Sequence, residues 1–255
     1  MRTVQATRYV TPLREGGSLP AVIEADDDGL YVLKFRGAGQ GPKALVAELV
    51  AGEIARALGL PIPELVFVEL EAELARTEPD PEIQELIRAS DGLNLALDYL
   101  PGAINFDPVA EQVPAALASE IVWFDAFVSN VDRSFRNPNL LVWHRKPWLI
   151  DHGAALYFHH GWDGTPSHAD SAFPMIREHV LLPQADDIAG ADARLVSRLS
   201  RDTFEAILAQ VPEAWLVGID TPQDPGAHRA AYVEHFMQRL AHRQRFVEEA
   251  VCARA

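Results

Sequence analysis

The segment at residues 130–156, NVDRSFRNPNLLVWHRKPWLIDHGAAL, limits the possible folds of this chain more than any other part of it. It holds two short apolar runs, LLVW at residues 140–143 and WLI at residues 148–150, on either side of the turn-like sequence HRKP. Short apolar runs around a polar turn are typical of a β-hairpin. Because paired strands bring their ends together, residues just before the first run and just after the second are expected to lie side by side.

Polar residues occupy both ends of this predicted hairpin. Asp132 and Asn137 precede the first strand, and Asp151 follows the second. A single Asp-x4-Asn pair has little specificity, since both residue types are common in turns. Phosphoryl transfer, however, needs one carboxylate at the attacking hydroxyl, and an Asn with a second carboxylate to hold Mg²⁺ on the nucleotide phosphates. The layout therefore predicts a kinase active site, with Asp132 as the catalytic residue and Asn137 and Asp151 as metal ligands.

Composition narrows the class of protein. The 255 residues are 48% hydrophobic and 23% charged, as in ordinary soluble globular proteins. A net charge of −15 argues against binding to nucleic acid or to an anionic membrane surface, since both favour basic patches. Cys252 is the single cysteine, so no intrachain disulfide can form. Because the N-terminus lacks a signal-peptide core and no apolar run approaches ~18 residues, we expect a cytoplasmic protein that binds neither nucleic acid nor membrane.

The first seventy residues or so have the pattern of a small sheet with one helix. Residues 21–24 and 30–35 are β-rich runs joined by the turn sequence ADDDG, and residues 62–70 predict another strand. Between them, residues 42–58 predict a helix, with Pro42 in its first turn and Gly59 after its end. The apolar residues of this helix are expected on roughly one side: Leu45, Leu49, Ile54 and Leu58.

The break at Pro101-Gly102 divides the chain into two predicted parts. A strand at residues 92–100 ends there, and the remainder is mostly helical apart from the hairpin. The predicted helices are residues 113–130, 202–210 and 227–253. We therefore predict an α+β protein with a small β-rich part at residues 1–101, which contains one helix, and a larger helical part at residues 102–255, which carries the hairpin.

Two charged residues in the first part complete a kinase-like set. Lys34 lies in an otherwise apolar strand, and Glu48 lies in the middle of the following helix. Each by itself is more often the exposed side of its element. A strand lysine paired with a helix glutamate is nevertheless the ion pair that places the lysine on the nucleotide phosphates of protein kinases. Glu48 is the preferred partner of Lys34, and Glu53 is the alternative.

Three segments are candidates for nucleotide binding. Gly16, Gly17 and Ser18 precede the first strand pair and could fold over phosphates, because glycine lets backbone N–H groups approach closely. The glycine-rich residues 37–41 are a second candidate, and a plain surface turn is an equally good interpretation of either loop. The third segment, Asp98, Tyr99 and Leu100, ends a strand at the boundary between the two parts and could meet an adenine edge, although an ordinary strand end has the same pattern.

Four blocks of sequence, taken in order, resemble the HipA-like kinase family. They are YVLKF, ALVAELVAGEIARALGLPIP, the Asp132-x4-Asn137 motif, and LIDHG. The same layout is similar to the catalytic core of phosphatidylinositol 3/4-kinases, whose loop reads Asp-Arg-x-x-x-Asn. The resemblance extends from about Tyr9 to about Ala155 and more loosely over the helical tail. No single block is specific, but the ordered set is. It implies a two-lobed protein-kinase-like fold.

The resemblance also implies a chemistry. It implies ATP and Mg²⁺ as cofactors, and an acceptor hydroxyl on an unidentified protein, such as a Ser or Thr, or on a small molecule. Lys34 would contact the ATP phosphates, Glu48 would pair with it, and Asp132 would act as the acid/base. The chain departs from the family in having Asp-His-Gly in place of Asp-Phe-Gly and in being too short for the extra N-terminal subdomain of toxin-type members, so toxin function is not inferred. A nucleotide-binding pseudokinase without turnover is the alternative function.

The remaining polar residues suggest less specific roles. Five histidines gather in the second part, and substrate contact is their expected role: His144, His152, His159, His160 and His168. A transition-metal site of His159, His160, His168 and Asp170 is the weaker alternative, because the spacing matches no known zinc motif. Arg133 is expected to neutralise the catalytic Asp, to touch substrate, or to lie on the surface. Asp125 is expected to be a satisfied carboxylate on a helix face.

Overall fold

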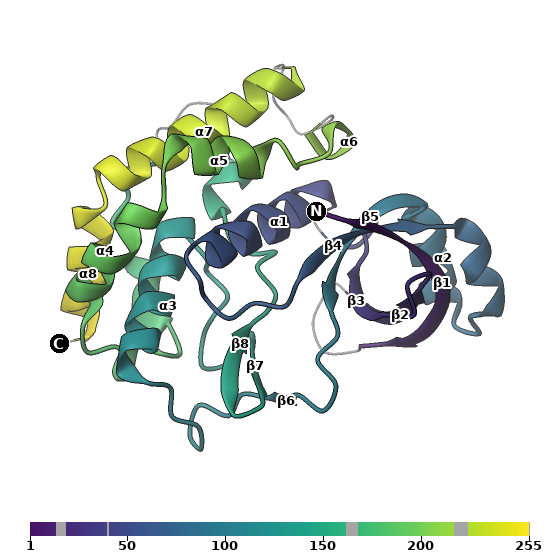
Figure 1. The fold of residues 1–255 in the computed structure, drawn as a ribbon, viewed down its shortest axis with the longest axis horizontal. Helices are drawn as coiled ribbons and strands as arrows, with labels where there is room; N and C mark the ends of the chain where they lie inside the picture. The colour runs from purple at the N-terminus through teal and green to yellow at the C-terminus, as the bar shows by residue number, and fades with distance from the viewer. Residues whose placement is uncertain (14–18, 40, 162–167, 217–223, 255) are drawn as a thin grey trace.

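The protein is described here by a computed structural model that covers residues 1–13, 19–39, 41–161, 168–216 and 224–254. A strand-rich part built from the first hundred residues lies at one end of the molecule, and helices form the other end. The helix α1 lies between the two (Figure 1).

The strands of the first part form a closed barrel in the order β1-β2-β3-β5-β4. Their bounds are β1 Thr3–Pro12, β2 Ala21–Ala25, β3 Leu30–Lys34, β4 Leu65–Leu70 and β5 Gly92–Asp98. The strand β1 has no counterpart among the predicted strands, and it closes the barrel by pairing antiparallel with β2 and parallel with β4. Because only Val4 and Ala6 of its ten residues are buried, β1 lacks the apolar alternation that marks the other strands.

The barrel has its own apolar core, which orients β3. Tyr31 and Leu33 point into this core, so their neighbours Val32 and Lys34 lie on the outer face of the barrel. The short helix η1, Ala72–Thr77, and α2, Pro81–Ala89, pack residues of the same core. The expected strand at residues 62–70 is shorter in the structure, since β4 begins only at Leu65. Pro61 and Pro63 precede it and cannot donate to a strand ladder.

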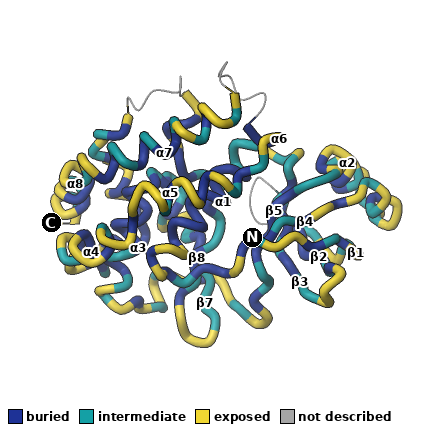
Figure 2. Tube along the Cα trace, turned by 45° about the horizontal axis from the view of Figure 1, so that its top comes forward, coloured by how far each residue is buried: buried dark blue, intermediate teal, exposed yellow. Residues whose placement is uncertain are grey.

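The helix α1, Pro42–Ala57, is buried on every side, and the prediction of a single apolar face was wrong. Every residue from Leu45 to Ala55 is buried, including Glu48 and Glu53. The reason is the position of the helix, which contacts β4 and β5 on one side and α5 and α6 on the other. Its apolar residues belong to the same core as those of α3 and α7, and the exposed residues of the protein concentrate on the outer helices and loops (Figure 2).

The second part is mostly helical, as predicted. Its helices are α3 Ala115–Val128, α4 Ile188–Leu195, α5 Arg201–Leu208, α6 Glu213–Leu216, α7 Pro225–Ala241 and α8 Gln244–Arg254, with short 3-10 helices η2 Tyr157–His160, η3 Pro174–Glu178, η4 Leu182–Gln184 and η5 Val196–Arg198. The long helix expected at residues 227–253 is divided into α7 and α8 by a break at His242. After this break, Phe246 of α8 packs against Trp123 and Phe127 of α3. Within the described residues, no helix combines the length and apolar character needed to span a membrane.

The predicted hairpin is confirmed. Its strands are β7 Leu140–Trp143 and β8 Lys146–Leu149, and β6 Ile104–Asn105 adds a third strand beside β7. The turn is tighter than expected: His144 and Arg145 alone form it, with φ values of 48° and 63°. Positive φ at both central residues matches the twist of a two-residue hairpin. Pro147 therefore belongs to β8, where it is tolerated because β8 is an edge strand.

Candidate active site

A cleft of about 680 Å³ opens between the outer face of the barrel and the hairpin. Apolar residues line it on both sides: Val32 and Leu97 from the barrel, and Leu140, Leu141 and Ile150 from the hairpin. Lys34, Asn137 and Asp151 also line it, together with the segment from Asp98 to Leu100. Residues that lie far apart in the sequence therefore meet in one cleft.

Lys34 lies between two carboxylates. Its Nζ is 2.7 Å from Asp151 Oδ1 and 3.8 Å from Glu48 Oε2. Burial alone would lower the pKa of Lys34, but the charges of Glu48 and Asp151 outweigh it and raise the pKa, so the amine is a cation. The alternative partner, Glu53, instead pairs with Arg56 at 2.6 Å. Of the two glutamates considered from the sequence, Glu48 is the one beside Lys34.

Glu48 is held from its other side by His152. The ring Nδ1 of His152 lies 3.4 Å from Glu48 Oε1, and the ring is fully buried. Burial by itself would raise the pKa of Glu48, but Lys34, and after it His152, lower the pKa below its usual value. The prediction that His152 contacts substrate is therefore wrong, because its ring packs inward on Phe124 of α3.

Two amides hold the Asp132 carboxylate. Asn137 Nδ2 donates to Asp132 Oδ2 at 2.8 Å, and Asn139 Nδ2 donates to the same oxygen at 3.3 Å. The backbone N–H of Asp132 donates to Asn130 Oδ1 at 3.2 Å. Sequence reasoning missed Asn139, whose local signal is only its place before the strand and a left-handed φ of 48°. Asn137 and Asn139 both line the cleft, so these two amides hold the Asp132 carboxylate beside it.

A fully buried ion pair supports this loop. It corrects the expectation for Arg133 and agrees with the expectation of a satisfied carboxylate at Asp125. Arg133 Nε lies 2.6 Å from Asp125 Oδ2, and both side chains are completely shielded from solvent. Arg133 Nη1 also donates to the carbonyls of Asn139 and Ile150. One guanidinium thus joins the loop that follows Asp132 to both ends of the hairpin. It neither faces solvent nor neutralises Asp132.

Asp125 has two further donors besides Arg133. Asn130 Nδ2 donates to Oδ1 at 2.8 Å, and His179 Nε2 lies 2.9 Å from Oδ2. The backbone N–H of Leu181 donates to His179 Nδ1, so the ring proton is on Nε2. Burial alone would raise the pKa of Asp125, but Arg133 and His179 outweigh it and lower the pKa far below its usual value.

We expect Arg133→Met to lower the free energy of unfolding by about 3–5 kcal/mol at neutral pH, because it leaves a buried carboxylate without its counter-ion. Urea denaturation measures the difference. Since the folded-state pKa of Asp125 is depressed, the pair stabilises the protein above pH about 4, and the difference should shrink as the pH falls below that value. The control is Arg136→Met, the same change at an exposed position of the same loop, for which about 0.5 kcal/mol or less is expected. Equal losses in the two variants would contradict the role of the buried pair.

The oxygen atoms at the cleft suit a hard cation. Asn137 and Asp151 both line it, and neither side chain offers sulfur or imidazole nitrogen. Amide and carboxylate oxygens are preferred by Mg²⁺, which is usually held by one or two protein groups together with phosphate oxygens. Among the described residues, no three or more His, Cys, Asp or Glu side chains form a cluster that could hold a metal alone. The donor set thus fits a cation shared with a bound phosphate group.

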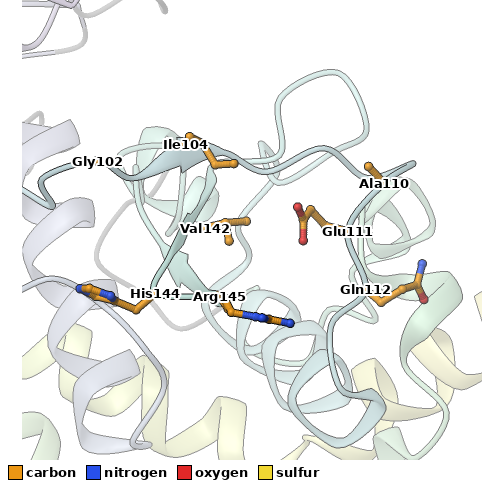
Figure 3. A pocket seen from close by; sticks show the side chains of 8 residues that line it. All are labelled: Gly102, Ile104, Ala110, Glu111, Gln112, Val142, His144 and Arg145. Atoms are coloured by element: carbon orange, nitrogen blue, oxygen red, sulfur yellow. The ribbon is translucent and has the colours of Figure 1, made fainter.

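The alternative interpretation of the histidines, a transition-metal site, is not found within the described residues. His159 Nδ1 lies 3.0 Å from the hydroxyl of Tyr232, and Asp170 pairs with Arg245 at 3.0 Å. His160 and His168 are exposed, and none of the five histidines lines the cleft. His144 instead lines a second hollow of about 730 Å³, between the hairpin turn and the segment that follows β6 (Figure 3). Apart from His144, none of the residues predicted for catalysis, nucleotide binding or metal binding lines that hollow.

The candidate nucleotide-binding segments differ in where they lie. Gly16, Gly17 and Ser18 fall outside the described residues, but Leu13 and Pro20 on either side of them line the cleft. The alternative loop leads away from the cleft, since the N–H of Gly37 donates to Ser90 Oγ at 3.0 Å.

The strand end at Asp98 reaches the cleft with its backbone. Asp98 pairs directly with Tyr31, so its side chain lies on the same face as this core residue, and burial together with the nearby Glu64 raises its pKa. The backbone N–H groups of Asp98 and Tyr99 donate to Glu64 O and Leu30 O. The backbone groups of Tyr99 and Leu100 that these bonds do not use are the ones left for the expected contact with a base edge.

The fold and the site together define a protein-kinase-like protein, and comparison with known proteins agrees. A sequence profile of the HipA-like kinase family matches residues 7–249, so the chain belongs to this family. Membership makes it a kinase-type phosphotransferase. A search of curated proteins finds no match.

Solved structures of kinases share the fold at low sequence identity. The proinflammatory kinase CtkA of Helicobacter pylori has a TM-score of 0.56 and 14% identity, over 98% of this chain and 97% of that one. A Golgi casein kinase with Mn/ADP bound has a TM-score of 0.52 and 12% identity, over 97% of this chain and 74% of that one. The predicted mixture of strands and helices in a protein-kinase-like fold is thereby confirmed.

Proposed function

We propose that this protein is a Mg²⁺- and ATP-dependent kinase that transfers the γ-phosphate of ATP to a hydroxyl acceptor, such as a Ser or Thr side chain of a protein. One observation carries the proposal: the residues that phosphoryl transfer requires meet around a single cleft although they come from separate segments. Lys34, Asn137 and Asp151 line the cleft, with Glu48 beside Lys34 and Asp132 beside Asn137.

We assign residues 1–101 to a nucleotide-binding lobe and residues 102–255 to a catalytic lobe. The separate apolar core of the barrel supports this division, as does the position of the cleft between the barrel and the hairpin. Apolar residues on the two sides of the cleft suit the flat faces of a base: Val32 and Leu97 on the barrel side, and Leu141 and Ile150 on the hairpin side. The helix α1 belongs to the first lobe by sequence but packs in the core of the second.

Each residue of the set has a role in the transfer. Lys34 would bind the phosphates, and Glu48 would orient Lys34. Asp132 would orient the acceptor hydroxyl and take its proton as the acceptor oxygen bonds to the γ-phosphorus and the bond to the ADP oxygen breaks. Asn137 and Asp151 would hold Mg²⁺, which when bound neutralises charge on the phosphates. The ion pair of Lys34 with Asp151 would then open, since Asp151 turns to the cation.

The proposal is tested by measuring nucleotide binding and turnover in the same preparation. We expect Mg-ATP to raise the melting temperature and γ-labelled ATP to be consumed, first by slow hydrolysis and faster once an acceptor is supplied. Stabilisation without any turnover would instead indicate a nucleotide-binding pseudokinase. A panel of proteins and metabolites incubated with γ-labelled ATP would identify the acceptor.

We expect Lys34→Met to lower turnover strongly and Glu48→Gln more modestly, because Lys34 would touch phosphates whereas Glu48 only orients it. The double variant should be no worse than Lys34→Met alone, since residues that act as a unit are not additive. Turnover of γ-labelled ATP measures all three. Glu53→Gln is the matched control, because Glu53 is also buried in α1 but pairs with Arg56. Unchanged turnover in Lys34→Met would show that the barrel does not contribute Lys34 to the active site.

A further inference from the structure

The side chain of His152, the residue after Asp151, contacts Glu48 of α1. Its Nδ1 lies 3.4 Å from Glu48 Oε1, within hydrogen-bonding distance. A carboxylate only accepts hydrogen bonds, so Nδ1 carries the ring proton. The other oxygen, Glu48 Oε2, lies 3.8 Å from Lys34 Nζ. The two oxygens of Glu48 are thus divided between His152 and Lys34.

Glu48 needs this second partner to keep its position. Lys34 lies closer to Asp151, at 2.7 Å, than to Glu48, at 3.8 Å, so the lysine alone does not hold the glutamate. A buried carboxylate requires donors, and Glu48 is only 1% exposed. The turn lies next to the helix, since a side-chain carbon on Gly153 would make ordinary van der Waals contact, at 3.7 Å, with both Ala44 O and Glu48 Oε2. The turn that carries His152 therefore lies directly beside α1 at Glu48.

We propose that His152 is a positioning residue for phosphoryl transfer, which holds the Glu48 carboxylate where it keeps Lys34 directed at the nucleotide phosphates. The inference rests on the proposed function, because it takes Lys34 as the residue that binds phosphates. This role also explains why the chain has Asp-His-Gly in place of Asp-Phe-Gly. The histidine ring donates a hydrogen bond to Glu48, which a phenylalanine ring at this position cannot do.

Packing is the competing explanation for His152. Its ring meets Phe124 edge to face, with ring centroids 5.8 Å apart, and is completely buried. A residue kept for packing tolerates Phe and not Asn, whereas a residue kept for its N–H tolerates Asn and not Phe. The amide nitrogen of an Asn can take the place of Nδ1, and the ring of a Phe can take the place of the imidazole. These two substitutions therefore separate the roles.

We expect His152→Phe to lower kcat by about 10- to 100-fold, the effect of losing a hydrogen bond to a charged group, and His152→Asn to stay within about fivefold of wild type. In a Glu48→Gln background, His152→Phe should cost less than about threefold more, because the two residues act as one unit. Phosphorylation of the best acceptor is measured at saturating Mg-ATP, and circular dichroism confirms that each variant is folded. If His152→Phe does not fold, His152→Leu takes its place.

The reverse order, with His152→Phe active and His152→Asn impaired, would overturn the proposal in favour of packing. A full additional loss in the Glu48→Gln background would overturn it as well. Lys34→Met is measured alongside to keep the two claims apart. If Lys34→Met leaves turnover unchanged, the proposed function fails; if it abolishes turnover while His152→Phe does not lower it, only the positioning role is wrong.

Discussion

Replacing Asp132 with Asn should lower turnover by about 10²- to 10⁴-fold while ATP affinity stays within a few-fold of wild type. A base acts on the acceptor hydroxyl and not on the nucleotide, so its loss appears in kcat and not in binding. The structure also indicates that the substitution should leave the position of the side chain unchanged. The donors that hold the Asp132 carboxylate, Asn137 and Asn139, can keep an amide oxygen in the same place.

The measurement combines phosphoryl transfer from γ-labelled ATP with calorimetric titration of Mg-ATP. Asp98→Asn is the matched control, since Asp98 also borders the cleft but is the cross-strand partner of the core residue Tyr31. We expect the control to change turnover by less than about threefold, as for a group outside the reaction. Full turnover in Asp132→Asn would make the catalytic assignment wrong.

Replacing Asp151 with Ala should remove the dependence of ATP binding on Mg²⁺. Asp151 would supply the charge that holds the ion between the phosphates, so we expect Mg-ATP affinity to fall by about tenfold or more, to the level seen without metal. Asn137→Ala should weaken binding less, because a neutral amide oxygen contributes less to a hard cation. Lys34 also loses its partner at 2.7 Å in Asp151→Ala, which by itself would free the lysine for phosphates.

Titration of ATP with Mg²⁺ and with EDTA separates these two effects of Asp151. Loss of the metal ligand lowers affinity only when Mg²⁺ is present, whereas release of Lys34 raises affinity in both conditions. Asp151→Asn serves as the control for shape, since it keeps the size of the side chain and removes its charge. Equal Mg-ATP affinity in Asp151→Ala and wild type would contradict the assignment of the metal site.

Local patterns in the sequence were enough to predict the hairpin, the strand that carries Lys34 and the bounds of α1 to within about a residue. Each depends on signals carried by neighbouring residues: apolar alternation, proline at a helix start and polar residues at a turn. The family resemblance then related Lys34, Asp132 and Asp151 to one another. It did so without showing how any of them is held in place.

The positions of the supporting residues depend on contacts between distant segments, which no local pattern records. The sequence alone indicated an α+β chain with a kinase-like order of motifs around Asp132 and Asp151. Only the tertiary structure showed that β1 closes a barrel, that Arg133 is buried against Asp125, and that His152 turns inward to Glu48. Arginine is mostly exposed in proteins and histidine is intermediate in burial. Apolar packing assembled from the whole chain excludes water around Arg133 and His152 and makes a partner necessary.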